Sequence, residues 1–199
     1  QAWPVLLGKK LGKEVINLGI PGSGNARISK EIINRVLNGD DIELVIACFT
    51  SPHRQEHGDE DGVFDVWPGC QSRAFDRHHT HRKELIKYIS RHSNDHYDYR
   101  NYLRQIILLE TFLKSHDIPY VFLQAYGGGP MYELYKDELN NQKLVDSVDA
   151  EHFMEWPGDA IVHWTWGYDH GPGGHPLEEG QQIIAEKIYE HIRTKHRIS

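Results

Sequence analysis

Three apolar runs of strand length constrain the fold of this chain more than any other feature. They cover residues 14–20, 43–50 and 120–124. Each run is continuous rather than alternating, which is typical of strands that are buried on both faces, as in a parallel sheet. We therefore expect a sheet that is covered on both sides, and the segments between the runs have to supply the cover.

Apolar residues recur at helical spacing between these runs. This spacing predicts helices over residues 4–11, 25–39, 82–91 and 97–115, and a last helix that starts at Pro176. Asn25 is expected to cap the second of them. A weak helix is predicted near residues 131–139, residues 51–77 are expected to be irregular, and residues 160–166 are ambiguous between strand and loop.

The alternation of strands and helices predicts an α/β protein. The expected architecture has three layers, α/β/α, around a mostly parallel sheet, in the manner of flavodoxin-like folds. A chain of 199 residues is long enough to bury one substantial core, so a single domain over residues 1–199 is expected.

Charge and composition narrow the partners and the compartment. The net charge is −7 and is spread along the chain, which disfavours nucleic acid as a partner. No stretch approaches the roughly 18 apolar residues of a membrane span, so no membrane partner is expected. Two cysteines indicate no disulfide framework, and no targeting signal is visible, which fits a cytoplasmic or a virion-associated protein. The sequence leaves the oligomeric state open.

Loops at the carboxyl ends of parallel strands form the binding sites of such folds. The turn at residues 21–25, the loop that begins at Thr50 and the loop at residues 125–130 occupy such ends. The loop that carries His175 precedes the last helix, and we expect it to converge on the same edge. This edge of the sheet is where a site is expected.

Glycines punctuate the turn after the first run, in Asn17-Leu18-Gly19-Ile20-Pro21-Gly22-Ser23-Gly24-Asn25. Glycine lets backbone N–H groups approach a ligand closely, and the following helix adds partial positive charge, so the turn could stabilise an oxyanion. The alternative is a tight turn before a capped helix. The spacing matches neither a dinucleotide fingerprint nor a phosphate loop, so no cofactor is implied.

His175 lies in a rigid setting, Gly171-Pro172-Gly173-Gly174-His175-Pro176. A general base must be held within hydrogen-bond reach of its target, and such a turn suits that task. Asp169 lies upstream and could orient the imidazole, with His170 as another base or a bystander. The alternative is a surface histidine or a helix cap.

Two further clusters are weaker signals. Residues 77–81 read Arg-His-His-Thr-His, and His163 and His170 add to a histidine-rich chain, but the spacing of a zinc site is absent, so no metal ligands are assigned. Aromatic residues precede His175 and could stack on sugars, although such residues more often pack in a core. They are Trp156, Trp164, Trp166 and Tyr168.

The order of these motifs resembles the SGNH/GDSL hydrolase family, and in particular its bacteriophage and environmental members. Residues 17–22 look like the family's second block, an Asn-x-Gly-Ile-x-Gly turn in which Gly22 matches the oxyanion-hole glycine. Residues 43–50 look like the strand before the third block. Gly174-His175-Pro176, with Gly180, resembles the final block, in which the histidine is the base.

The resemblance implies an esterase that acts through a serine acyl-enzyme, on a small-molecule or carbohydrate ester and without a cofactor. His175 would take the proton of the serine, Gly22 would stabilise the oxyanion, and Asp169 would hold the imidazole. The block with the serine is not in this chain, so we expect it upstream of Gln1, together with its strand.

Two other positions depart from the family pattern. Thr50-Ser51-Pro52-His53 stands where the third block has an asparagine, and Pro172 stands where the last block has an aspartate. Replacement polar contacts to the substrate or the oxyanion are expected from four residues: Asn25, Thr50, Ser51 and Arg54. The alternatives are an inactive SGNH-fold binding or virion-associated module, and a histidine-rich, metal-dependent hydrolase.

Overall fold

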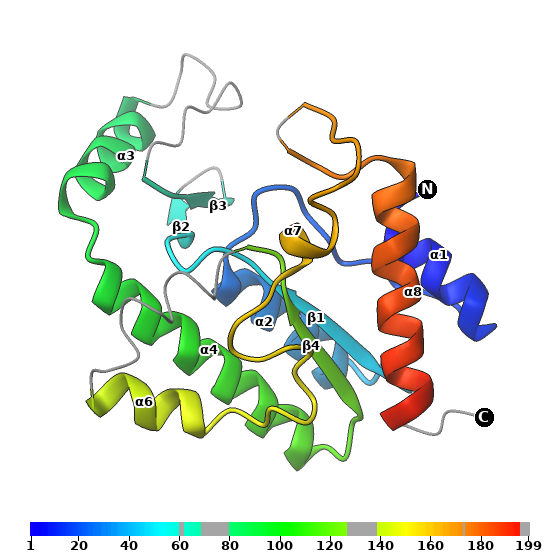
Figure 1. Ribbon diagram of the computed structural model, residues 1–199. Coiled ribbons are helices and arrows are strands. Elements are labelled where there is room, and N and C mark those ends of the chain that lie inside the picture. Colours follow the sequence, from blue (N-terminus) through cyan, green and yellow to red (C-terminus); the bar gives the residue numbers. More distant parts are fainter. Residues whose placement is uncertain (60–61, 69–79, 127–138, 173, 196–199) are drawn as a thin grey trace.

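The computed structural model describes residues 1–59, 62–68, 80–126, 139–172 and 174–195, which form a mixed α/β structure (Figure 1). The helices are α1 (Trp3–Leu11), α2 (Asn25–Leu37), α3 (Thr80–His92), α4 (Asp95–Ser115), α6 (Leu139–Asp146), α7 (Ile161–Trp164) and α8 (Glu178–Lys195). The strands are β1 (Val45–Phe49), β2 (Gln55–Asp59), β3 (Gly62–Val66) and β4 (Tyr120–Gln124).

Strands β1 and β4 pair in parallel and form the centre of the molecule. Their register runs from Val45 opposite Tyr120 to Phe49 opposite Gln124. Every residue of β4 is buried, as its continuous apolar run predicts. The predicted strands at residues 43–50 and 120–124 and the parallel pairing are therefore confirmed for this pair.

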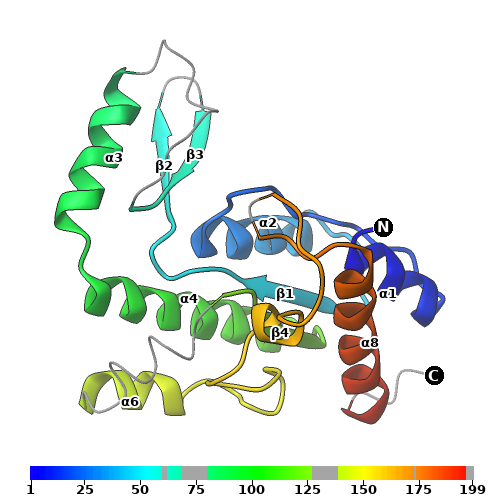
Figure 2. The same ribbon diagram turned by 45° about the horizontal axis from the view of Figure 1, so that its top comes forward.

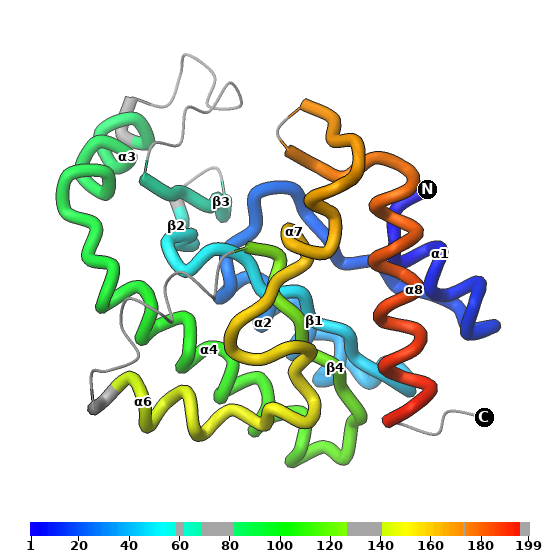
Figure 3. Tube along the Cα trace, viewed as in Figure 1, coloured from blue at the N-terminus to red at the C-terminus, as the bar shows by residue number. Residues whose placement is uncertain are grey.

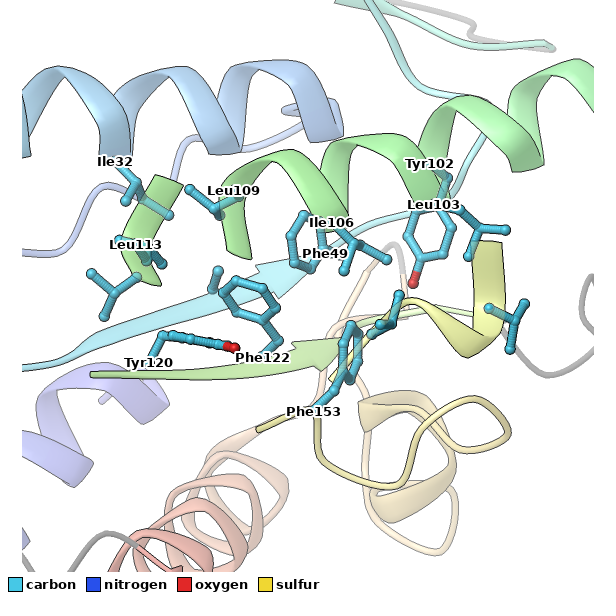
Figure 4. Close-up of a cluster of buried hydrophobic side chains, with 14 of the residues drawn as sticks. Ile32, Phe49, Tyr102, Leu103, Ile106, Leu109, Leu113, Tyr120, Phe122 and Phe153 are labelled. Carbon is cyan, nitrogen blue, oxygen red and sulfur yellow. The ribbon is translucent and has the colours of Figure 1, made fainter. Parts of the chain in front are cut away.

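Alternate residues of β4 face two different apolar clusters, because successive side chains of a strand point to opposite faces. Tyr120 and Phe122 join a cluster with α2 and α4, and Figure 4 shows these rings lying under the side chains of α4. Val121 and Leu123 join a second cluster with α1, α7 and α8. Helices therefore cover both faces of this small sheet.

Aromatic rings form the centre of the larger cluster (Figure 4). The ring of Phe49 meets that of Phe122 edge to face at 5.2 Å between centroids and stacks on that of Phe153 at 6.1 Å. Burying one such side chain contributes about 1.5–3 kcal/mol, and the ring geometry adds to that. This packing fixes the end of β1, at which the candidate site begins.

Residues 14–20 depart from the prediction of a buried strand. They lie in no strand or helix, and Val15, Ile16 and Ile20 are 40%, 54% and 44% exposed. A strand needs a hydrogen-bonded neighbour, and no described residue pairs with this segment. A cavity lies between the segment and β1 instead.

Residues 51–77 were expected to be irregular, but they contain the antiparallel hairpin of β2 and β3, with Gln55 opposite Val66. Figure 2 shows the hairpin and α3 standing away from the central sheet. The Asp65 carboxylate ties the hairpin to α2, because it accepts hydrogen bonds from the Gly24 N–H at 2.8 Å and from Arg27 at 3.3 Å. Residues 69–79 lie outside the described residues.

Helices α1, α2, α3, α4 and α8 are present as predicted, and each predicted boundary lies within two residues of the one found. Gly24, not Asn25, is the N-cap of α2. Residues 160–166 contain the short helix α7 rather than a strand or loop, and α8 begins at Glu178 rather than at Pro176. The predicted helix at residues 131–139 lies almost wholly outside the described residues.

Helices α1 and α8 pack side by side along one flank, as the trace in Figure 3 also shows. The Trp3 N–H donates to the side chain of Gln181 at 2.8 Å, which joins the start of α1 to the first turns of α8. Gly180 permits the turn before α8, because a Cβ there would lie 2.6 Å from the Cβ of Pro176. None of the helices that the structure describes has the length and apolar character needed to cross a bilayer.

Candidate functional site

A cavity of about 1170 Å³ lies between residues 13–20 and β1 and extends to the carboxyl ends of β1 and β4. Thr50 lines it just after β1, and Tyr126 lines it just after β4. Gly22 and His175 line the same cavity, from the turn before α2 and from the loop before α8. The structure therefore brings together the loops that the sequence places at one edge of the sheet.

The Gly22 turn is held in a conformation that requires glycine. Gly22 has φ +85°, and the Ser23 N–H donates to the Ile20 carbonyl at 3.2 Å. A Cβ on Gly22 would lie in ordinary contact with the ring of Trp67, at 3.7 Å. Among the described residues nothing accepts a hydrogen bond from the Gly22 N–H, and Gly22 lines the cavity.

His175 lies on a narrow loop that is closed by backbone hydrogen bonds. The Gly171 N–H donates to the His175 carbonyl at 2.8 Å, and the Leu177 N–H donates to the Asp169 carbonyl at 2.9 Å. Gly174, at φ +75°, supplies the left-handed residue that the loop needs. The backbone of His175 is thus fixed, while its side chain is exposed and lines the cavity.

Asp169 lies at the base of that loop, across from Leu177. The described part of the chain contains no hydrogen bond or ion pair between its carboxylate and the imidazole of His175. The Nε2 of His170 lies 3.4 Å from the hydroxyl of Thr165. The orienting role of Asp169 stays a prediction.

Asn25 joins α2 to the end of β1 through a buried side chain. Its Oδ1 accepts from the Thr50 N–H at 2.8 Å, and its Nδ2 donates to the carbonyls of Thr50 and Ser51 at 3.2 and 3.3 Å. These contacts use both N–H donors of the amide, and its oxygen accepts one bond, so the side chain positions the loop. The Thr50 hydroxyl is buried without a described partner, and that of Ser51 accepts from the His53 N–H at 3.4 Å.

Arg54 lines the same end of the cavity and lies near two aromatic rings. Its guanidinium carbon lies 5.0 Å from the ring centroid of Trp67 and 5.9 Å from that of Tyr126. Its Nη1 donates to the Ser23 carbonyl at 3.4 Å. Arg54 thereby connects the loop after β1, the hairpin, the loop after β4 and the Gly22 turn.

A histidine–aspartate pair that the sequence does not single out lies beside this region. The Nδ1 of His53 meets the buried Asp98 carboxylate at 3.2 Å, and Gln55 and Ser93 donate to the same carboxylate at 3.1 and 3.0 Å. The hydrogen bond to Asp98 raises the pKa of His53 above its ordinary value, against the opposing effect of burial. His53 is not among the residues that line the cavity.

The aromatic cluster before His175 divides between core and surface. Trp164 is buried and donates to the Glu155 carboxylate at 2.6 Å, so it anchors α7. Trp166 is 78% exposed and stacks on His163 at 6.0 Å between centroids. Within the described ranges no three His, Cys, Asp or Glu side chains gather as a metal site requires. His78 and His79 lie outside those ranges.

Comparison with known proteins identifies a family. The family described as "Family of unknown function (DUF6071)" matches residues 1–199, so the chain belongs to it. No curated protein and no solved structure matches the chain.

Proposed function

We propose that this member of the DUF6071 family is an ester hydrolase of the SGNH type, in which His175 is the general base and Gly22 supplies an oxyanion-hole N–H. One observation supports the proposal above all: these two residues, which lie far apart in the sequence, line the same cavity at the carboxyl ends of β1 and β4. The Gly22 N–H, which donates to no residue that the structure describes, and the hydrogen-bonded backbone around His175 suit those two roles.

The proposed reaction is acyl transfer through a serine. The serine oxygen attacks the ester carbonyl carbon while His175 takes the proton of the serine hydroxyl. The oxyanion of the tetrahedral intermediate accepts a hydrogen bond from the Gly22 N–H. Collapse of this intermediate breaks the ester C–O bond, and the alcohol leaves with the proton from His175. Water then attacks the acyl-enzyme with His175 again as base, which releases the acid and restores the serine.

The serine and its strand belong to the proposal and not to residues 1–199. The empty space between residues 14–20 and β1 supports a strand at this place. Val15, Ile16 and Ile20 are exposed on one wall of the space, and Ile46 and Cys48 line the other. A parallel strand here would pair with both walls. It would complete the larger central sheet of a three-layer α/β/α fold. Its carboxyl end would lie near Gly22 and His175.

A carbohydrate ester is the substrate class that we propose. The exposed rings of Trp166 and Tyr168 lie upstream of the His175 loop, and exposed aromatic faces suit the apolar faces of sugars. The competing idea of an inactive binding module has the same cavity in its favour but predicts no covalent intermediate. The two ideas therefore separate on chemistry rather than on binding.

Covalent labelling tests the proposal directly. The protein, produced with any residues that precede Gln1 in its gene, is treated with a fluorophosphonate, whose phosphorus a nucleophilic serine attacks with loss of fluoride. We expect labelling of the wild type and a loss of about a hundredfold or more in rate for His175→Ala. His170→Ala, a neighbour on the same loop, is the matched control and should label as the wild type does. An unlabelled wild type, or equal labelling of His175→Ala, would contradict the proposal.

A further inference from the structure

The lysine and arginine side chains that line the cavity differ in whether a carboxylate lies beside them. Lys13 pairs with Glu43 at 2.6 Å, Arg27 with Asp65 at 3.3 Å and Arg35 with Asp40 at 3.2 Å. Arg54 lines the same cavity, yet no carboxylate of the described residues lies within 4.0 Å of its guanidinium. Among these four cationic side chains, Arg54 is therefore the one that no carboxylate of the described residues neutralises.

The surroundings of Arg54 hold the guanidinium without using most of its donors. A guanidinium carries five N–H donors, and only one of them has a described acceptor, the Ser23 carbonyl at 3.4 Å. Trp67 and Tyr126 present their ring faces, which favour a cation but accept no strong hydrogen bond. The group is thus oriented in advance, so little rotamer entropy is lost when a ligand binds.

The position of Arg54 connects this unused charge to the proposed chemistry. Its bond to Ser23 attaches it to the residue that follows Gly22, and His175 lines the same cavity. A planar fork of N–H donors matches the two oxygens of a carboxylate. We propose that Arg54 binds a carboxylate of the substrate, so that the cavity takes an anionic ester such as an ester of a sugar acid. That the ligand is an ester rests on the proposed function, whereas the binding of its carboxylate by Arg54 does not.

Equilibrium binding to the 199-residue chain tests the inference without any turnover. The probe is D-glucuronate, D-glucose is its neutral counterpart, and NMR follows the indole N–H signals of the tryptophans. We expect glucuronate to bind, glucose to bind at least tenfold more weakly, and Arg54→Gln to weaken glucuronate by about ten- to a hundredfold. Arg54→Lys keeps the charge without the fork and should fall between the two.

Arg35→Gln is the matched control, because Arg35 lines the same cavity but is already paired with Asp40. It should leave glucuronate affinity within about twofold of the wild type. Circular dichroism of each variant separates lost binding from lost folding. Equal affinity for glucose and glucuronate, or an unchanged affinity in Arg54→Gln, would overturn the inference. Tighter binding of inorganic phosphate than of glucuronate would also overturn it, because the receptor would then be one for phosphate.

The outcome is distinguishable from that of the proposed function. Glucuronate should bind to His175→Ala nearly as it binds to the wild type, since Arg54 and not His175 holds the anion. Binding of glucuronate by a protein that no fluorophosphonate labels would leave the anion site standing and reject the esterase. Labelling that depends on His175, in a protein that does not bind glucuronate, would support the esterase and reject the anion site.

Discussion

At the scale of single residues, the buried Asp98 carboxylate joins three segments near the candidate site. It lies on α4 and is 3% exposed, and it receives hydrogen bonds from His53, Gln55 and Ser93. These donors come from the loop after β1, from β2 and from the residue that follows α3. A buried carboxylate is stable only when its lone pairs are satisfied, so this group fixes the hairpin relative to α4.

The His53–Asp98 pair makes the stability of the fold depend on pH. The hydrogen bond to Asp98 raises the pKa of His53 above 6.5, so the charged pair stabilises the fold fully below about pH 6.5. The stabilisation is lost as the pH rises through the raised pKa. We expect Asp98→Asn to lower the free energy of unfolding by about 1–3 kcal/mol below pH 6.5, and by less at alkaline pH.

Urea unfolding of the wild type and of Asp98→Asn over a pH series measures this difference. Asp95→Asn is the control, because its carboxylate lies 3.8 Å from His53 and is half exposed. It should lower the free energy of unfolding by less than about 1 kcal/mol. A gap between wild type and Asp98→Asn that stays constant across the pH series would show that His53 is not the titrating partner.

At the scale of elements, the amide of Asn25 decides how α2 meets β1. It is 3% exposed and bonds the N–H and the carbonyl of Thr50 as well as the Ser51 carbonyl. Asn25→Ala would leave these backbone groups buried without partners. We expect a loss of about 2–4 kcal/mol in the free energy of unfolding. Asn34→Ala, at an exposed position of the same helix, should be neutral or slightly stabilising. Chemical denaturation of both variants checks the difference, and equal effects would contradict the role of Asn25.

The sequence predicts those elements whose signal is local. Continuous apolarity predicts β1 and β4, and helical spacing predicts α4. The same apolar pattern at residues 14–20 predicts a strand that the described structure lacks, because pairing depends on a neighbour and not on the segment itself. The hairpin escapes prediction for the opposite reason: β2 is polar, and a distant contact from Asp65 to Arg27 secures it.

The candidate site also divides into features with a local sequence signal and features that depend on long-range contacts. The glycine turns predict where Gly22 and His175 lie, because a left-handed residue or a tight loop leaves a mark in the local sequence. The tie from Asn25 to Thr50 and the stacking of Arg54 on Trp67 leave no such mark. They join residues that are distant in the chain, and only the folded backbone brings them together.

At the scale of the whole molecule, the cavity separates two apolar parts of the chain, one buried and one exposed. On one side, β4 is buried between two helical clusters, with Phe122 in one and Leu123 in the other. On the other side, the segment at residues 14–20 exposes Ile16 to solvent and shares no ladder with β1. Local stability follows the number of buried contacts and paired backbone groups, so these two parts should open at very different rates.

Hydrogen exchange of the 199-residue chain measures that difference. The amides of Val15, Ile16 and Leu18 have no described acceptor, so we expect them to exchange within about tenfold of the rate in an unstructured peptide. The amides of β4 bond to β1 and to the segment at Phe153, and should be slower by a factor on the order of 10³ or more. A strand bound in the cavity would pair with residues 14–20, so a protein that contains the proposed strand should protect both segments alike. Strong protection of residues 14–20 in the 199-residue chain would mean that another segment already fills the space, and the proposal of a further strand would then fail.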